Sequence, residues 1–208
     1  MTWDPFGTVH KALWIGGAPW AGKSTVARLL AARHGLTTYH HDYHDTGGTD
    51  GDEARPAAAG DPETWVHTTA ERMLSETLAE FSLRFTGALD DLRALMSPHP
   101  IVAEGRGLRP DLVAPEVDSP GRMVVLVPTE LFRQHQLRQL PWAASVGSKV
   151  SDPERAQRNR VARDRLLAAD AVRSARKLGI RVIEIDGSLG PEDVTDVVDD
   201  HFAGFLPG

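Results

Sequence analysis

Residues 17–24 read Gly17-Ala18-Pro19-Trp20-Ala21-Gly22-Lys23-Ser24, and the rest of the chain can be placed around this segment. The segment fits the pattern G-x-x-x-x-G-K-[ST], which is the Walker A or P-loop sequence. A short apolar run at 12–15 precedes it, and a helical pattern at 24–33, which ends before Gly35, follows it. Strand, glycine loop and helix are the context that this motif requires, so we interpret the match as a phosphate-binding loop and not as chance.

The residue types of this loop suit a nucleotide. Glycines let the backbone turn tightly, so that successive N–H groups can point at phosphate oxygens. The N-terminus of the following helix adds a partial positive charge. We expect Lys23 to reach the β- and γ-phosphates and the Ser24 hydroxyl to bind Mg²⁺. The predicted nucleotide-binding residues of the loop are Gly17, Ala18, Pro19, Trp20, Ala21, Gly22, Lys23, Ser24 and Thr25.

Composition excludes several classes of protein. The chain has 208 residues, 41% of them hydrophobic and 25% charged, as is ordinary for a single globular domain. The absence of cysteine excludes disulfides and thiolate metal sites, and the net charge of −6 argues against indiscriminate nucleic-acid binding. No signal-peptide pattern opens the chain, and no apolar run approaches the roughly 20 residues of a membrane span. We therefore expect one cytoplasmic domain, residues 1–208, a monomer or homodimer with no nucleic-acid or membrane partner.

Short apolar segments alternate with helical patterns along the chain. The predicted strands are Leu13–Gly16, Thr37–His41, Ile101–Glu104, Met123–Val127 and Arg181–Asp186. The predicted helices are Lys23–His34, Pro62–Met96 with a break near Gly87, Glu130–Leu140, Pro153–Leu178 and Pro191–Phe205. Strands that alternate with helices indicate an α/β protein with a parallel sheet covered on both faces.

A carboxylate follows the second predicted strand. Ligands of such sheets bind at the carboxyl ends of the strands, so Asp42 is expected to face the phosphates. There it can accept the proton of an attacking hydroxyl or hold Mg²⁺ through water, or it can simply cap the next segment. The nearby His40, His41 and His44 suggest a zinc site, but adjacent strand residues point to opposite faces. We therefore expect these histidines, His44 among them, to form a polar wall of the substrate pocket.

The third predicted strand ends in Glu104-Gly105-Arg106-Gly107. Glu104 is a candidate for orienting the Mg²⁺ shell, or for acting as the base in place of Asp42, and the sequence leaves both roles open. The two glycines would let a ligand approach the backbone closely. Arg106 is either an anchor for an anionic group or a solvated turn residue. The candidate substrate-binding residues are Asp42, His44, Glu104 and Arg106, and the candidate metal ligands are Ser24, Asp42 and Glu104.

An arginine-rich segment opens the fourth long helical pattern. Arg155 and Arg158 form one i,i+3 pair, and Arg160 and Arg163 form another, so each pair shares a helix face. Arginines that close over a nucleotide stabilise charge on the transferring phosphoryl group, whereas the alternative is a solvated face. The predicted catalytic residues are Lys23, Asp42, Arg158, Arg160 and Arg163. Arg155 is predicted to contact the nucleotide, and Gly187 to border the adenine.

The order of these features resembles that of a known group of proteins. A P-loop, an Asp after the second strand, a Glu-Gly third strand, the Arg-rich helix and a terminal Ile185-Asp186-Gly187-Ser188 are similar to the nucleoside and nucleotide kinase branch of P-loop proteins. That branch includes shikimate kinase, gluconate kinase and chloramphenicol phosphotransferase. The runs 101–110, 126–132 and 163–168 resemble a bacterial group of P-loop kinase-like proteins of uncertain substrate.

The resemblance implies a three-layer P-loop NTPase fold with a five-stranded parallel sheet of order 2-3-1-4-5. It also implies ATP with Mg²⁺, an Arg-rich helical lid at about residues 141–165, and an acceptor-binding region at about residues 42–96. In shikimate-kinase-like and chloramphenicol-phosphotransferase-like proteins an Asp after the second strand contacts the acceptor hydroxyl, and Asp42 is the matching residue. The third strand departs from the pattern because it ends in Glu104 and not in an Asp.

These features together predict an ATP-dependent kinase that transfers the γ-phosphate to a hydroxyl of a small molecule. The acceptor classes left open are a natural product or antibiotic, a nucleoside, and a sugar acid. A nucleoside monophosphate kinase is one alternative, and it needs basic residues for the acceptor phosphate. A non-catalytic, ATP-binding regulatory protein is the other.

Overall fold

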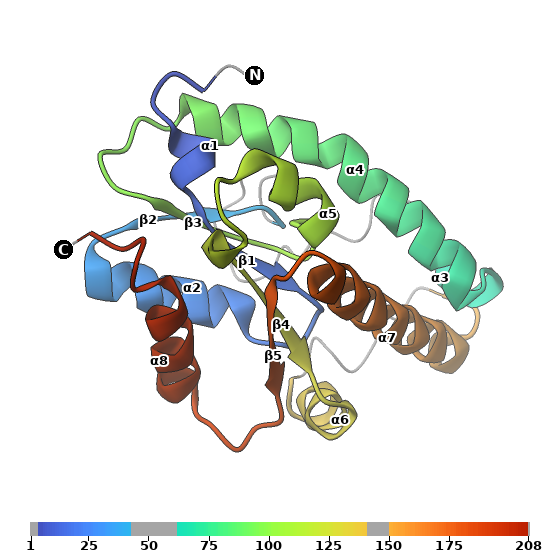
Figure 1. Ribbon diagram of the computed structural model, residues 1–208. Helices are drawn as coiled ribbons and strands as arrows, with labels where there is room; N and C mark the ends of the chain where they lie inside the picture. Colours follow the sequence, from blue (N-terminus) through green and yellow to red (C-terminus); the bar gives the residue numbers. More distant parts are fainter. Residues whose placement is uncertain (1–3, 43–61, 141–149, 208) are drawn as a thin grey trace.

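Five parallel strands form a single sheet at the centre of the molecule (Figure 1). The computed structural model describes residues 4–42, 62–140 and 150–207. The strand order is β2-β3-β1-β4-β5, which confirms the predicted order 2-3-1-4-5. Every neighbouring pair is parallel. The strands are β1 Leu13–Gly17, β2 Thr37–His40, β3 Ile101–Glu104, β4 Met123–Pro128 and β5 Arg181–Ile185.

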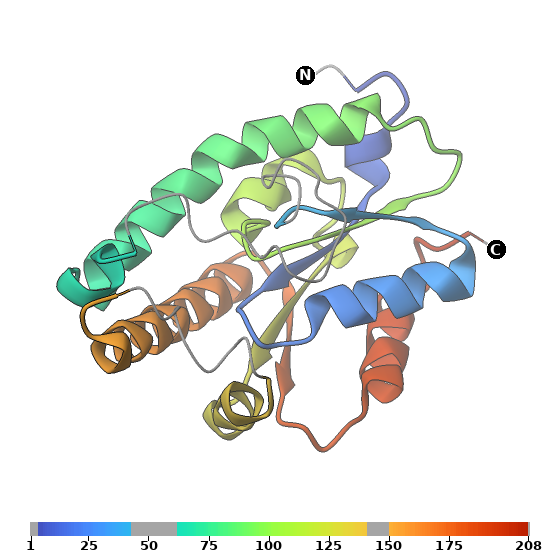
Figure 2. The same ribbon diagram turned by 180° about the vertical axis from the view of Figure 1, so that it is seen from behind.

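Helices cover both faces of the sheet, so the predicted three-layer architecture is confirmed (Figure 1 and Figure 2). The longer helices are α2 Lys23–His34, α4 Ala70–Ala94, α6 Glu130–Gln139, α7 Pro153–Lys177 and α8 Pro191–Phe202. The short ones are α1 Thr8–Lys11, α3 Thr64–His67, α5 Pro110–Val113 and the 3₁₀ turns Ala114–Glu116 and Pro120–Arg122. No helix among the described residues combines the length and the apolar character needed to cross a bilayer.

The alternation of side chains along each strand produces two separate apolar cores. In β1, Trp14 points to the face covered by α4 and α7, whereas Leu13 and Ile15 point to the face covered by α2 and α8. Every residue of β1, β3 and β4 is buried. Central strands of a parallel sheet are enclosed on both faces, and this is why the sequence shows them as continuous apolar runs.

The predicted helix at 62–96 differs from the structure in where it breaks. The predicted break near Gly87 is wrong, because α4 runs through that residue without interruption. Its buried stripe continues on both sides of the glycine, through Phe85, Ala88 and Leu92. One glycine inside a helix costs only about 1 kcal/mol relative to alanine, which this packing offsets. The chain breaks instead at an extended Thr68, between α3 and α4.

The ends of the other predicted elements differ from the observed ends by at most three residues. The short helices α1 and α5 and the two 3₁₀ turns were not predicted. None of these is longer than four residues, and so short a segment carries no measurable helical period.

The two halves of α7 pack on different parts of the molecule. The C-terminal half lies on the sheet, where Ala168, Ala171 and Ala175 join the core. The N-terminal half lies against α3 (Figure 2). Ala156 packs there on Val66. Of the predicted lid at 141–165, residues 141–149 lie outside the described part of the chain. The part from 153 onward belongs to this docked helix.

Candidate active site

The P-loop connects the end of β1 to the start of α2 and is fixed to the neighbouring strand β4. Gly17 has φ +123°, and a Cβ atom on it would lie 2.0 Å from the Leu126 carbonyl oxygen, so this position requires glycine. The Ala18 N–H donates to that same carbonyl at 3.0 Å. Gly22, at φ +74°, precedes α2 and supplies no side-chain cap. The N–H groups of the first turn of α2 therefore keep their capacity to bind an anion.

The ammonium group of Lys23 lies inside the loop. The side chain is buried, and its Nζ atom donates to the Ala18 carbonyl oxygen at 2.8 Å. Burial lowers the pKa of Lys23, while the nearby carboxylates of Asp42 and Glu104 oppose this shift. The loop thus holds a cation at the place where the motif predicts a phosphate contact.

The buried carboxylate of Glu104, at the end of β3, connects the end of β2 with the start of α2. Its side chain is 1% exposed, and its Oε1 atom accepts hydrogen bonds from the Ser24 hydroxyl at 3.0 Å and from His40 Nδ1 at 2.8 Å. The hydrogen bond with Glu104 raises the pKa of His40. The Oε2 atom is buried and has no hydrogen-bond partner among the described residues. A buried carboxylate oxygen without a partner, beside a serine hydroxyl, is a donor set that fits Mg²⁺ with its water shell.

Asp42 lies just beyond β2 and faces the turn that follows β3. Its Oδ2 atom accepts a hydrogen bond from the Arg106 N–H at 3.2 Å, and its Oδ1 atom lies 3.8 Å from Arg106 Nε. Burial acts to raise the pKa of Asp42, but the His41 imidazole, Arg106 and Lys23 together hold this pKa well below its usual range. Asp42 is therefore a carboxylate at neutral pH.

The neighbouring histidines His40 and His41 contact different carboxylates. His41 is buried, and its Nδ1 atom lies 3.6 Å from Asp42 Oδ1, whereas His40 contacts Glu104. The space beside Gly107 is occupied by the His41 ring, because a Cβ on this glycine would meet Cε1 at 2.4 Å. In this structure the group that lies closest to this glycine is thus the His41 ring. No cluster of three His, Asp or Glu side chains within the described ranges is arranged to hold a metal ion. His44 lies outside those ranges.

One of the predicted arginines lies against the P-loop. The Arg160 guanidinium lies 5.4 Å from the centre of the Trp20 ring, on the loop itself. Arg155 and Arg158 are exposed, and Arg158 lies 3.7 Å from Glu154 on the same helix. The structure therefore brings Arg160 to the site and leaves this exposed pair on the solvent side of α7.

Arg163 is buried and is held by contacts with its neighbours. It is 7% exposed, its Nε donates to Asp164 at 2.9 Å, and its guanidinium lies 4.8 Å from the centre of the Trp65 ring. Burial lowers the pKa of Arg163, while Asp164 opposes the shift. Asp164 was not among the predicted site residues, because in the sequence it only reduces the charge of an arginine run.

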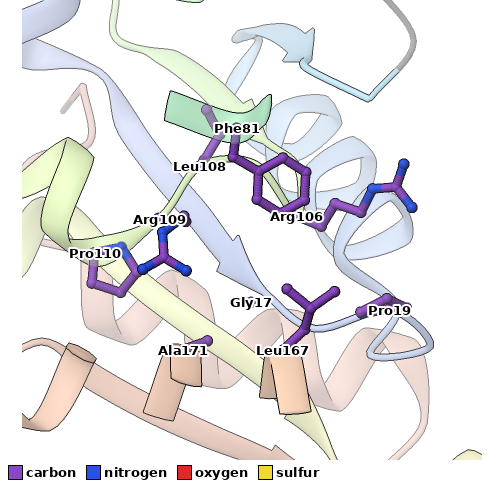
Figure 3. A pocket seen from close by; sticks show the side chains of 9 residues that line it. All are labelled: Gly17, Pro19, Phe81, Arg106, Leu108, Arg109, Pro110, Leu167 and Ala171. Carbon is purple, nitrogen blue, oxygen red and sulfur yellow. The ribbon is translucent and has the colours of Figure 1, made fainter. Parts of the chain in front are cut away.

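A pocket opens beside the P-loop, between the end of β1, α4, α5 and α7 (Figure 3). Its walls are mostly apolar, and Arg106 lies next to the ring of Phe81, 6.0 Å from the ring centre. Arg109 at the other end is neutralised by Asp170 at 2.6 Å and Asp111 at 2.9 Å. The residues that line the pocket are Gly17, Pro19, Phe81, Arg106, Leu108, Arg109, Pro110, Leu167 and Ala171. Of these, only Gly17, Pro19 and Arg106 were predicted as site residues.

Gly187 follows β5 and has φ +86°. A Cβ atom there would lie 2.7 Å from the Phe132 ring, so the glycine admits this ring of α6. A small recess beside it is lined by residues of β5 and α8. Thr25, in the first turn of α2, is partly exposed. The predicted contacts of Gly187 and Thr25 with a nucleotide stay predictions.

A Walker A loop after the central strand, one carboxylate after β2, another at the end of β3, and the strand order 2-3-1-4-5 define a P-loop protein of the kinase type of fold. Two shikimate kinases are among the solved structures similar to this chain. The enzyme from Acinetobacter baumannii, in complex with shikimate, is 16% identical, with a TM-score of 0.51 over 98% of this chain and 100% of that one. The enzyme from Aquifex aeolicus is 14% identical, with a TM-score of 0.42 over 92% and 95%. The likeness to the first confirms the expected P-loop kinase-like fold.

The comparisons with sequences found no further relationship. No protein-family model matches the chain, and no curated protein sequence matches it. At 16% identity, the likeness to the A. baumannii enzyme describes the fold and leaves the activity to be argued from the site.

Proposed function

We propose that this protein is an ATP-dependent kinase that transfers the γ-phosphate to a hydroxyl group of a small molecule. The observation that carries the proposal is the pair of carboxylates beside the P-loop. Glu104 contacts the Ser24 hydroxyl, whereas Asp42 is bound to the backbone of Arg106, which lines the pocket. One carboxylate is thus placed for the nucleotide and its cation, and the other for an acceptor.

The loop and Lys23 would bind the phosphates of the nucleotide. The N–H groups of the loop and of the first turn of α2 would bind the phosphate oxygens, and the Lys23 ammonium would exchange the Ala18 carbonyl for a phosphate. Ser24, Glu104 and, through water, Asp42 would hold Mg²⁺, which neutralises charge on the β- and γ-phosphates when bound. The unpartnered Oε2 atom of Glu104 supports this assignment.

The acceptor side centres on Asp42. Its lowered pKa keeps it ionised, so it can accept a hydrogen bond from an acceptor hydroxyl and orient the oxygen toward the γ-phosphorus. In the transfer, the bond between this oxygen and phosphorus forms while the bond from phosphorus to the β–γ bridging oxygen breaks. ADP leaves, and the hydroxyl proton passes to Asp42 and from there to solvent.

Arg160 is the arginine that the geometry favours for stabilising the transferred group. It lies over Trp20 on the loop, while Arg155 and Arg158 are exposed and Arg163 is enclosed. A guanidinium placed beside the phosphates stabilises charge that develops on the equatorial oxygens.

Two arginines that could hold the phosphate of a nucleoside monophosphate are paired with carboxylates. On α4, Arg72 lies 2.9 Å from Glu76, and Arg84 lies 2.7 Å from Glu80. No contact among the described residues therefore favours a phosphate-bearing acceptor over an uncharged alcohol or a carboxylic acid.

The proposal is tested by ADP release from Mg-ATP with and without a panel of acceptors. The panel contains nucleosides, nucleoside monophosphates, sugar acids, hydroxylated antibiotics and shikimate, the ligand of the A. baumannii neighbour. We expect one class to accelerate release, and we expect Asp42→Asn to lower kcat by roughly 10²- to 10⁴-fold with little change in ATP affinity. Lys23→Ala should abolish turnover. Uniformly slow release with tight ATP binding would favour a regulatory protein, and full activity of both variants would refute the mechanism.

A further inference from the structure

Trp20 holds an unfavourable backbone conformation in the middle of the P-loop. Its φ angle is +71°, and among the described residues it is the one non-glycine residue with a positive φ. A side chain with a Cβ atom seldom adopts this region, and a bulky aromatic residue there is an outlier. Such a conformation persists only where the surroundings hold it.

A carboxylate from α7 accepts a hydrogen bond from the Trp20 side chain. The indole Nε1–H of Trp20 donates to Asp164 Oδ2 at 3.0 Å, although the two residues are 144 positions apart in the chain. Asp164 is 2% exposed, and a hydrogen bond to a buried, charged acceptor is stronger than a bond between neutral groups. Arg160 lies against the same indole ring.

The second carboxylate oxygen of Asp164, Oδ1, also accepts a hydrogen bond. Arg163 Nε donates to Oδ1 at 2.9 Å, and the Arg163 guanidinium also contacts Thr77 of α4 and the ring of Trp65 of α3. The carboxylate therefore does not turn toward the nucleotide. It is a fixed acceptor, supported from α3 and α4, with one oxygen left for the indole.

We propose that Asp164 is a positioning residue, which holds the Walker A loop in its phosphate-binding conformation through the indole N–H of Trp20. Without this contact, the residue at position 20 relaxes toward negative φ and turns the adjacent loop N–H groups away from the phosphates. The inference rests on the proposed nucleotide site for its effect on binding, but the loop conformation can be measured with no nucleotide present.

The experiment compares Trp20→Phe with the matched control Trp65→Phe. The first change removes the indole N–H and keeps an aromatic ring at position 20. The second makes the same change at Trp65, which contacts Arg163 and not Asp164 itself. In nucleotide-free protein, we expect the amides of 18–24 to exchange hydrogen roughly tenfold faster in Trp20→Phe, from loss of one charge-assisted bond. Exchange elsewhere should be unchanged, and Trp65→Phe should match the wild type at 18–24.

Trp20→Gly provides the rescue. Glycine adopts positive φ without an anchor, so Trp20→Gly should lose less affinity for ADP and ATP than Trp20→Phe, which should bind them roughly tenfold more weakly than the wild type. Unchanged exchange at 18–24 in Trp20→Phe would overturn the inference, as would faster exchange spread over the whole chain. Equal loss of affinity in both variants would also overturn it. A wild-type protein that binds no nucleotide would refute the proposed function, while the exchange result would still decide the role of Asp164.

Discussion

Replacing Glu104 by glutamine tests whether this buried carboxylate helps to bind Mg²⁺ or only stabilises the folded protein. The change keeps an oxygen that can accept from Ser24 and His40, but it removes the negative charge. Charge-assisted hydrogen bonds contribute about 1.5–3 kcal/mol and neutral ones about 0.5–1.5 kcal/mol, so the two bonds together lose about 2–3 kcal/mol. Removing a buried charge returns a desolvation penalty of several kcal/mol.

The weaker hydrogen bonds lower the free energy of unfolding, and the removal of the buried charge raises it by a similar amount. The new amide N–H₂ would lie near the place of the unpartnered Oε2 atom, where it adds the cost of about 1–3 kcal/mol for a buried donor without an acceptor. We therefore expect Glu104→Gln to change the stability of the protein by less than about 2 kcal/mol. The variant should fold.

The effect on function should be much larger than the effect on stability. Loss of a residue that holds a metal or its water shell typically lowers metal affinity or activity about 10- to 100-fold. The assay is ADP release as a function of Mg²⁺ concentration, with urea unfolding of the same samples and with Glu116→Gln, at the end of a 3₁₀ turn, as the matched control. If Glu104→Gln folds and keeps the wild-type dependence on Mg²⁺, the assignment of Glu104 to the cation is wrong.

Three further predictions address the loop, the arginine and the response to pH. Gly17→Ala should destabilise the protein by at least about 2 kcal/mol in urea unfolding and abolish ATP binding, because its Cβ atom would overlap the Leu126 carbonyl. Arg160→Ala should lower kcat by at least about tenfold, while Arg176→Ala, on the exposed end of the same helix, should leave it unchanged in the ADP-release assay. Burial lowers the pKa of His201, so its contribution to stability is fully present above the unfolded pKa of about 6.5 and is lost as the pH falls below it. The stability of the wild type relative to His201→Gln should therefore fall between about pH 7.5 and pH 5. A difference in unfolding free energy that stays constant over this range would show that the pKa of His201 is not lowered.

The elements that could be predicted from the sequence are those whose signals are local. A strand buried on both faces reads as an apolar run, and β1, β3 and β4 were located within one residue at each end. The order of the strands, by contrast, followed from the resemblance to P-loop kinases and not from periodicity. The break expected at Gly87 was wrong because the sequence does not show how firmly the helix is packed on either side of that residue.

The arginine-rich helix shows why the candidate site could be predicted only in part. Its i,i+3 spacing indicated which arginines share a face, and the structure does place Arg155 and Arg158 together in solvent. The spacing could not indicate which face turns inward, because that depends on how α7 packs on α3. Arg163 was predicted to act on phosphate, yet it is enclosed by Trp65 and Asp164.

Residues adjacent in the chain therefore carry the phosphate-binding loop, since glycine freedom, the lysine and the helix N-terminus act within eight consecutive positions. The same local order places a carboxylate after each of two strands. The partners of those carboxylates arise only in the folded chain: Ser24 meets Glu104 across 80 positions, and Trp20 meets Asp164 across 144. Contacts over such separations depend on the sheet order and on helix packing, which bring these side chains within hydrogen-bonding distance and bury them together.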